Sequence, residues 1–215
     1  MSNAEPIVYV VDDDASVRRS LQWLVESIGL KAAALASARE FLTAYDASQP
    51  GCLVLDLRMP DMSGLELQEE LARRGQGIPV IIITGYGEIP AAVRAMKAGA
   101  IDFIEKPFSE HTLLERIQEA AGQAVEVFRD RQARLELTTK VRCLTPREAT
   151  VMQCVVDGLA NKQIAARLNL SEKTVEVHRS RLMKKLGAHS VAELVRIALR
   201  VSNGEGFPMP ADDKP

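Results

Sequence analysis

Four short apolar segments in the first half of the chain each end at a polar side chain. These segments are Ile7–Val11, Leu53–Leu55, Val80–Ile83 and Phe103–Ile104. The polar residues that follow them are Asp12–Asp14, Asp56, Thr84 and Lys106. Strands of a parallel sheet are buried on both faces, so they read as continuous hydrophobic runs. Because the carboxyl ends of such strands share one edge, we expect carboxylates, a hydroxyl and an ammonium in one crevice.

Helical patterns alternate with these strand-like segments. They cover Ser16–Ile28, Ala38–Tyr45, Gly64–Arg73, Ile89–Ala98 and Glu110–Ala121. A repeated alternation of strands and helices with short connections favours right-handed crossovers and a parallel sheet. The first half therefore predicts an α/β domain with a flavodoxin-like, five-stranded parallel sheet that binds ligands at the carboxyl ends of its strands.

The second half of the chain predicts an all-α domain of four helices. These helices are Pro146–Val156, Asn161–Leu168, Glu172–Leu186 and Val191–Arg200. Thr145 and Glu148 have the spacing of a capping box at the first of them. Between the halves, residues 110–139 form one long helical candidate with a partial apolar seam. The seam consists of Ile117, Ala121, Ala124, Phe128 and Leu135. This segment is either a helix that pairs in a dimer or a charged tether, and we favour a continuous helix.

Length and charge divide the chain in the same way. Its 215 residues, 47% of them hydrophobic, suffice for two modest domains. The net charge of −2 includes two opposite charge balances. Residues 1–122 contain eleven basic and eighteen acidic residues, whereas residues 143–206 contain ten basic and six acidic residues. We expect a domain over 1–122, a helical linker over 123–142, a basic domain over 143–206 and a disordered tail over 207–215. A basic domain favours a polyanionic partner.

Composition predicts a cytoplasmic protein. Apolar segments are too short to cross a bilayer, and no signal-like segment precedes Ile7. The three cysteines, Cys52, Cys143 and Cys154, are far apart and have no histidines at metal-binding spacing. We expect them to be reduced and buried.

Four motifs in the first half resemble the receiver domain of two-component response regulators, most closely the FixJ type. They are Val10–Asp14, Leu55–Gly64, Ile83–Gly85 and Asp102–Phe108, and the resemblance covers residues 7–122. It implies that Asp56 accepts a phosphoryl group from a sensor histidine kinase, as an acyl phosphate. The spacing of all four motifs is a stronger signal than any one of them.

The resemblance also implies a Mg²⁺ cofactor. Its ligands would be Asp13, Asp56 and the backbone carbonyl of Arg58, with Asp12 binding directly or through water. Lys106 would pair with the phosphoryl oxygens, and its bond to Pro107 is the expected cis peptide.

A conformational switch follows from the same resemblance. Thr84 would donate its hydroxyl to the phosphoryl group, and its movement would let the ring of Phe103 turn inward. Phe103 has no hydroxyl, so burial alone would stabilise its inward state. Asp14 is expected to cap a helix.

Two other functions are open at this point. The segment Asp12-Asp13-Asp14-Ala15-Ser16 also fits the D-x-D-x-S signature of haloacid-dehalogenase-like phosphatases, with Asp12 attacking and Asp14 as acid. This enzyme hypothesis leaves Leu55–Gly64 unexplained. The other alternative is a regulator that binds DNA without control by phosphorylation.

The strings LTPRE and GLANKQIAARLNLSEKTVEVHRSRLMKKLGAHS resemble the LuxR-type helix-turn-helix of the NarL/FixJ group. This implies that Glu172–Leu186 enters the major groove of DNA. Its inner face would carry Val175, Leu182 and Leu186. The expected DNA contacts are Lys173, Thr174, Glu176, Val177, His178, Arg179, Ser180, Arg181 and Lys184, with Asn161 and Lys162 on the preceding helix.

Two of these residues suit base recognition. Val177 can touch a thymine methyl group, and Glu176 can accept a hydrogen bond from cytosine. Relatives often carry lysine at the position of Glu176, so an acidic side chain there departs from the pattern and suggests selection by rejection. For His178, a packed structural role and a DNA contact are both open.

The sequence as a whole predicts a transcription factor gated by phosphorylation. By resemblance, phosphorylation promotes a homodimer that binds double-stranded promoter DNA and contacts RNA polymerase, with no membrane partner. The pairing surfaces would be Ile89–Ala98 with Ile101–Glu105 in the first domain, and Val191–Arg200 in the second.

Overall fold

The computed structural model describes residues 5–85 and 89–202. The chain divides into two compact units, Met1–Arg129 and Asp130–Pro215. This division lies inside the predicted linker. The expected tail over 207–215, and residues 203–206 of the predicted second domain, lie outside the described residues.

The first unit is built on a five-stranded parallel sheet, which confirms the predicted α/β fold. The strands are β1 (Ile7–Val11), β2 (Lys31–Leu35), β3 (Gly51–Asp56), β4 (Val80–Thr84) and β5 (Asp102–Glu105). Their spatial order is β2-β1-β3-β4-β5. The order in which strands are added to the sheet therefore reverses at β1, with β2 on one side of it and β3 on the other. The carboxyl ends of β1 and β3 lie side by side at this point, where a ligand crevice is expected.

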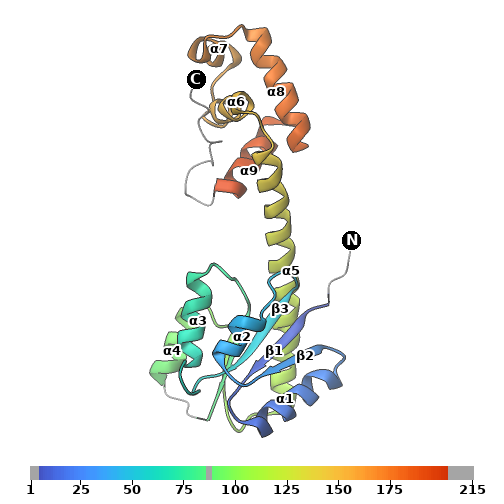
Figure 1. The fold of residues 1–215 in the computed structure, drawn as a ribbon, viewed down its shortest axis with the longest axis vertical. Helices are drawn as coiled ribbons and strands as arrows, with labels where there is room; N and C mark the ends of the chain where they lie inside the picture. The colour runs from blue at the N-terminus through green and yellow to red at the C-terminus, as the bar shows by residue number, and fades with distance from the viewer. Residues whose placement is uncertain (1–4, 86–88, 203–215) are drawn as a thin grey trace. The chain divides into compact units, whose positions relative to one another are not determined.

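Helices cover both faces of this sheet (Figure 1). They are α1 (Ala15–Ser27), α2 (Ala38–Ala44), α3 (Gly64–Arg73), α4 (Ile89–Lys97) and α5 (Glu110–Arg142). Leu24 of α1 and Ile117 of α5 pack on one face of the sheet. Phe41 of α2, Leu67 of α3 and Ala95 of α4 pack on the other. The central strands β1, β3 and β4 between them are buried on both sides, as their unbroken apolar sequences predict.

The apolar pattern did not locate β2. Its sequence, KAAAL, has an exposed first residue and three half-buried alanines, because β2 lies at the edge of the sheet. Helix α1 starts at Ala15, one residue before its predicted start. Asp14 is the N-cap, as predicted, and its carboxylate accepts hydrogen bonds from the backbone N–H groups of Ser16 and Val17.

Helix α5 continues without a break from Glu110 to Arg142. Gly122 does not end it, because that position is open and costs only helix propensity. Ile117, Ala121 and Ala124 of the proposed seam are buried in the core of the first unit. These three side chains therefore pack inside the first unit and are not free to pair with a second helix. Of the five seam residues, only Leu135 is largely exposed.

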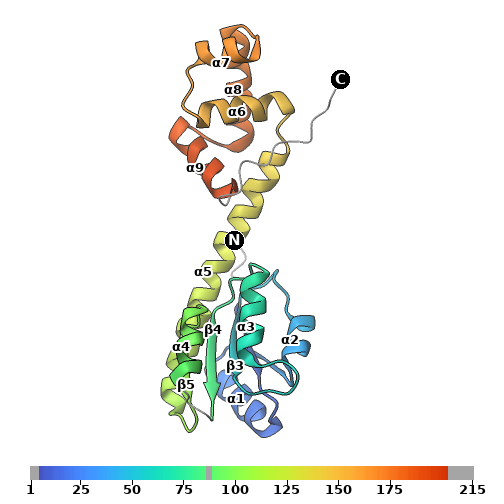
Figure 2. The same ribbon diagram turned by 90° about the vertical axis from the view of Figure 1, so that its left-hand side faces the viewer.

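The second unit groups four further helices, which confirms the predicted all-α fold (Figure 2). They are α6 (Pro146–Val156), α7 (Asn161–Leu168), α8 (Glu172–Leu186) and α9 (Val191–Ser202). The expected capping box at α6 is present, because Thr145 and Glu148 bond to each other's backbone N–H groups. Met152, Ile164 and Leu182 are fully buried and join α6, α7 and α8 in one core.

The cysteines follow the prediction in two of three cases. Cys52 and Cys154 are buried, and burial raises the pKa of the Cys52 thiol to about 12, so it is unreactive. Cys143 is exposed instead of buried, because it directly follows the last residue of α5 at the surface. Within residues 5–85 and 89–202, no helix is long and apolar enough to cross a membrane.

Candidate functional site

Polar side chains gather at the carboxyl ends of β1, β3 and β4. Asp12 follows β1, Asp56 ends β3 and Thr84 ends β4, and these residues are only 1%, 6% and 1% exposed. In the parallel register Val11 of β1 is opposite Leu55 of β3, so Asp12 and Asp56 lie beside each other. The predicted crevice therefore contains two buried carboxylates and a buried hydroxyl.

Lys106 connects the two carboxylates. Its ammonium lies 2.7 Å from Oδ2 of Asp12 and 2.8 Å from Oδ1 of Asp56. Lys106 follows β5, and its backbone N–H donates to the carbonyl of Thr84 over 2.7 Å. The Lys106–Pro107 peptide is cis, as predicted. Residues that are 94 and 50 positions apart in sequence thus meet at one ammonium group.

The ionisation of this cluster follows from its burial. Burial raises the pKa of Asp56, the hydrogen bond and charge of Lys106 offset part of the rise, and the nearby charge of Asp12 adds to it. Burial lowers the pKa of Lys106, but its bonds to Asp12 and Asp56 outweigh that effect and raise the pKa overall. Lys106 therefore stays charged beside the two acidic side chains.

The loop after β3 fixes the orientation of Asp56. Oδ2 of Asp56 accepts a hydrogen bond of 2.7 Å from the backbone N–H of Arg58. The loop then folds back, and the N–H of Gly64 donates to the carbonyl of Leu57. A Cβ atom at Gly64 would lie 2.4 Å from the backbone oxygen of Asp56, so only glycine fits there. Sequence reasoning treated Gly64 as a helix-entry residue and missed this close approach.

Asp12 is held from a second direction that the sequence did not reveal. Arg18 of α1 donates from Nη1 to the carbonyl oxygen of Asp12 over 2.7 Å. The other carboxylate oxygen of Asp12 accepts from the N–H of Asp14 over 2.9 Å. Because the contact depends on how α1 lies against the end of β1, no spacing rule could have identified Arg18.

The predicted metal ligands are partly assembled. Asp12 and Asp56 share the pocket, whereas the side chain of Asp13 is exposed beside it. Within the described part of the chain, no three His, Cys, Asp or Glu side chains form a ready metal site. Two carboxylates with one ammonium leave an excess of negative charge on hard oxygen ligands, and this donor chemistry fits Mg²⁺.

Phe103 lies in β5 opposite Ile82 of β4 and is half-buried against the sheet's core. Its predicted inward rotation stays a prediction.

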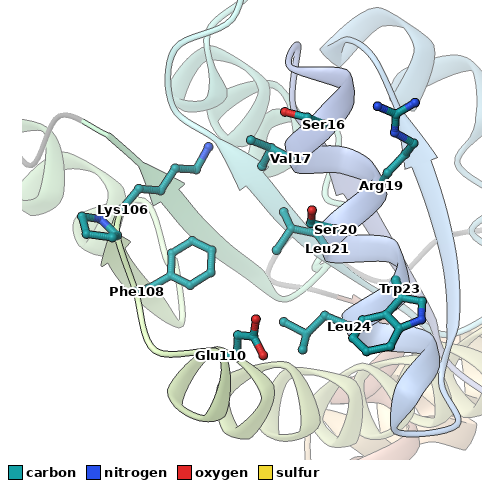
Figure 3. Close-up of a pocket in the computed structure, with 11 residues that line it drawn as sticks. Ser16, Val17, Arg19, Ser20, Leu21, Trp23, Leu24, Lys106, Phe108 and Glu110 are labelled. Atoms are coloured by element: carbon teal, nitrogen blue, oxygen red, sulfur yellow. The ribbon is translucent and has the colours of Figure 1, made fainter.

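A pocket of about 650 Å³ opens beside Lys106, between α1 and the segment that follows β5. Figure 3 shows Phe108 facing Leu21 and Leu24 of α1 across this pocket. Trp23 also lines it and is 70% exposed. Apolar side chains thus line part of the pocket next to Lys106.

In the second unit, α8 separates into the two faces that its sequence predicts. Val175, Leu182 and Leu186 are buried. The residues exposed on the other face are Lys173, Glu176, Val177, Ser180, Arg181 and Lys184. Ser171 caps the helix by accepting from the N–H of Thr174, and the Thr174 hydroxyl is hydrogen-bonded to that of Ser171. Among the six residues of the exposed face, three side chains are basic and one is acidic, which suits a polyanion.

Four of the predicted DNA contacts are half-buried, namely Asn161, Thr174, His178 and Arg179. His178 lies at the boundary between core and surface, and its role stays open. Arg179 donates from its guanidinium to Oδ1 of Asn161 at the start of α7, so these two predicted phosphate contacts are partners of each other. Lys162, the next residue of α7, is exposed.

Comparisons with known proteins agree with this geometry. Residues 8–118 match the family described as the response regulator receiver domain. Residues 142–198 match the family described as bacterial regulatory proteins of the luxR family.

Relatives match almost the whole chain. The transcriptional regulatory protein FixJ of Azorhizobium caulinodans is 46% identical over 96% of this chain and 95% of its own length. The response regulator protein TmoT of Ectopseudomonas mendocina is 45% identical over 94% of this chain and 92% of its own. Among solved structures, the response regulator StyR is 47% identical with a TM-score of 0.75, covering 90% of this chain and 98% of that one.

Proposed function

The chain belongs to the FixJ-like response regulators, transcriptional regulators that join a receiver domain to a LuxR-type DNA-binding domain, and from this premise we propose that phosphorylation of Asp56 controls its binding to DNA. The observation that carries this proposal is the bridge from Lys106 to the buried carboxylates of Asp12 and Asp56. A buried carboxylate with a purely structural role does not need to share its cation with a second carboxylate, as Asp56 does here with Asp12. A phosphoryl-transfer site, in contrast, needs a cation such as the Lys106 ammonium close to the attacking oxygen.

In the proposed transfer, a carboxylate oxygen of Asp56 attacks the phosphorus atom of a phosphohistidine on the sensor kinase. A P–O bond forms and the P–N bond breaks, and the histidine nitrogen keeps the electron pair and takes up a proton. The Lys106 ammonium, 2.8 Å from Asp56, can follow the charge onto the phosphoryl oxygens. Water later attacks the phosphorus atom, which releases phosphate and restores the carboxylate of Asp56. We expect this hydrolysis to be slow, and we expect no turnover of small phosphate esters.

Asp12, Asp13, Asp56 and the carbonyl of Arg58 are the residues that would hold Mg²⁺. When bound, the cation supplies positive charge against the carboxylates and the incoming phosphoryl oxygens. This assignment is supported by the uneven charge of the pocket, in which Asp12 and Asp56 share one ammonium. Arg18 contributes indirectly, because it holds the chain at Asp12.

The pocket between α1 and Phe108 supports docking of the kinase beside the reactive residues. It borders Lys106, and its apolar lining can accept a helix of the partner. Phosphorylation would then draw the Thr84 hydroxyl toward the phosphoryl group and let Phe103 turn inward. Thr84 supports this role because it is buried at the end of the strand beside β3.

The output is proposed to be a homodimer that binds promoter DNA through the exposed face of α8 and contacts RNA polymerase. Exposed apolar side chains on α4 and α9 support pairing through these two helices. On α4 they are Ile89, Val93 and Met96, and on α9 they are Val191 and Leu199. We place the protein in the cytoplasm, because both its target DNA and the catalytic part of its kinase are accessible in that compartment.

The test is to incubate the full chain with acetyl phosphate and Mg²⁺ and to measure its intact mass. We expect a gain of one phosphoryl group in the wild type and none in Asp56→Asn. The matched control is Asp61→Asn, an exposed residue of the same loop with φ +67°, a conformation that asparagine also tolerates. If Asp56→Asn gained the same mass as the wild type, the proposed phosphoacceptor would be wrong.

A further inference from the structure

Lys185 in the last turn of α8 makes a contact that no DNA-binding motif predicts. Its ammonium lies 2.6 Å from Oε2 of Glu148 in the first turn of α6. The same ammonium is 3.4 Å from the backbone carbonyl of Cys143, the residue that directly follows α5. One side chain of the proposed recognition helix therefore contacts both the beginning of α6 and the end of α5.

Glu148 is built into this contact more firmly than a surface ion pair would be. Its side chain is only 4% exposed, whereas that of Lys185 is 39% exposed. The carboxylate oxygen that binds Lys185 also accepts a 2.9 Å hydrogen bond from the N–H of Thr145. Burial acts to raise the pKa of Glu148, but the bonds from Lys185 and Thr145 outweigh it and lower the pKa. Glu148 is therefore an ionised, buried anchor.

We infer that Glu148 and Lys185 are positioning residues that hold the C-terminal end of α8 in the orientation needed to read DNA sequence. The inference rests on the proposed function, in which the exposed face of α8 enters the major groove. Lys184, the neighbour of Lys185, is exposed, and under the proposed function it contacts DNA. Two adjacent lysines thus have different tasks, one toward DNA and one toward the fold.

The two tasks predict different losses. Contacts to phosphates add affinity for any DNA sequence and make binding depend on salt. Contacts to base edges depend on hydrogen-bond geometry, so a small change in the orientation of α8 weakens binding to the preferred sequence most. Loss of the Glu148 anchor should therefore reduce sequence discrimination, whereas loss of Lys184 should weaken binding to all sequences.

The experiment uses the full chain treated with acetyl phosphate and Mg²⁺. The wild type first selects a preferred duplex from a random pool, and an unrelated duplex of the same length serves as the reference. Affinities for both duplexes are measured at several salt concentrations for Lys185→Met, Glu148→Gln, Lys185→Arg and the matched control Lys184→Met. Far-UV circular dichroism at the assay temperature shows that each variant is folded.

For Lys185→Met we expect about a tenfold loss on the preferred duplex, typical of coupled neighbouring residues, and little change on the unrelated one. Its salt dependence should equal that of the wild type, whereas Lys184→Met should weaken both duplexes and reduce the salt slope by about 0.9. Lys185→Arg keeps the charge and should restore discrimination. The double variant Glu148→Gln/Lys185→Met should bind the preferred duplex better than Lys185→Met, because no buried carboxylate is left unpaired.

Equal losses on both duplexes with a reduced salt slope would make Lys185 a phosphate contact and overturn the inference. Folded Lys185→Met with wild-type affinity for both duplexes would reduce the pair to a structural role and overturn it as well. If Lys185→Met does not fold, the comparison of Lys185→Arg with the double variant decides, and wild-type discrimination in the double variant overturns the inference. A wild type that selects no preferred duplex would instead contradict the proposed function.

Discussion

Replacing Lys106 by methionine removes the only cation that contacts Asp12 and Asp56 through a described ion pair. The two distances, 2.7 and 2.8 Å, show that both carboxylates depend on the same ammonium. Loss of one partner from a buried ion pair typically costs about 3–5 kcal/mol, because the remaining charge is left without compensation. Two carboxylates lose their partner here, and methionine keeps most of the apolar stem, so we expect a loss of about 3–5 kcal/mol at pH 7.

The loss should depend on pH and on magnesium. Without Lys106 the carboxylates repel each other, and the pKa of at least one rises in the folded state. A raised pKa favours the folded state at low pH, and this contribution disappears as the pH rises through the folded pKa. The destabilisation of Lys106→Met should therefore be largest at neutral pH and decrease on acidification. Mg²⁺ should also restore part of the stability if it binds these carboxylates.

The assay is urea unfolding with and without Mg²⁺. Trp23 is the only tryptophan of the chain and lies in α1, so its fluorescence reports on the receiver domain alone. The control is Lys97→Met on the exposed side of α4, which should change stability by less than about 0.5 kcal/mol. If Lys106→Met unfolded at the same urea concentration as Lys97→Met, the carboxylates would not need Lys106, and the electrostatic account of the pocket would be wrong.

Four further predictions concern the pocket and the DNA-binding face. Asp56→Asn should abolish phosphorylation yet stabilise the receiver domain by about 1 kcal/mol at pH 7 in urea unfolding, because Lys106 keeps Asp12 as its partner and one buried charge is gone. Phosphorylation by acetyl phosphate should slow as the pH falls through the raised pKa of Asp56, since only the carboxylate attacks; a flat rate between pH 4 and 7, roughly the range around an ordinary carboxyl pKa, would contradict this. Gly64→Ala should destabilise the domain by about 1–3 kcal/mol, because its Cβ would meet the backbone oxygen of Asp56, and should reduce the phosphorylation rate. Glu176→Gln should reduce discrimination between duplexes by about 1–3 kcal/mol and strengthen binding to unrelated DNA; unchanged selectivity would remove Glu176 from base recognition.

The sequence predicted most of the fold because the relevant signals are local. Buried strands such as Val80–Thr84 read as apolar runs, and α6, α7 and α8 begin and end where caps and periodicity place them. Strand β2 was missed because an edge strand made mainly of alanine has neither a strong apolar run nor clear alternation. The continuous helix favoured over residues 110–139 is confirmed, because Gly122 weakens the helical pattern without ending the helix, and α5 extends beyond that range to Arg142.

For the acidic crevice around Asp56, the sequence could predict which residues come together but not how they contact one another. Strand ends in a parallel sheet must lie along one edge, so the sequence could place Asp56, Thr84 and Lys106 together. It could not show that Asp12, and not Asp13, shares the ammonium with Asp56, because adjacent residues at the end of a strand point in opposite directions. The contact of Lys185 with Glu148 was equally hidden, since it depends on how α8 packs across α6.

The most direct test of the account is the affinity of the full chain for its selected duplex, measured with and without acetyl phosphate and Mg²⁺. We predict that this treatment increases the affinity of the wild type and leaves that of Asp56→Asn unchanged. Equal affinity of the wild type in both conditions, despite a confirmed phosphoryl group on Asp56, would contradict the central claim that this residue controls DNA binding.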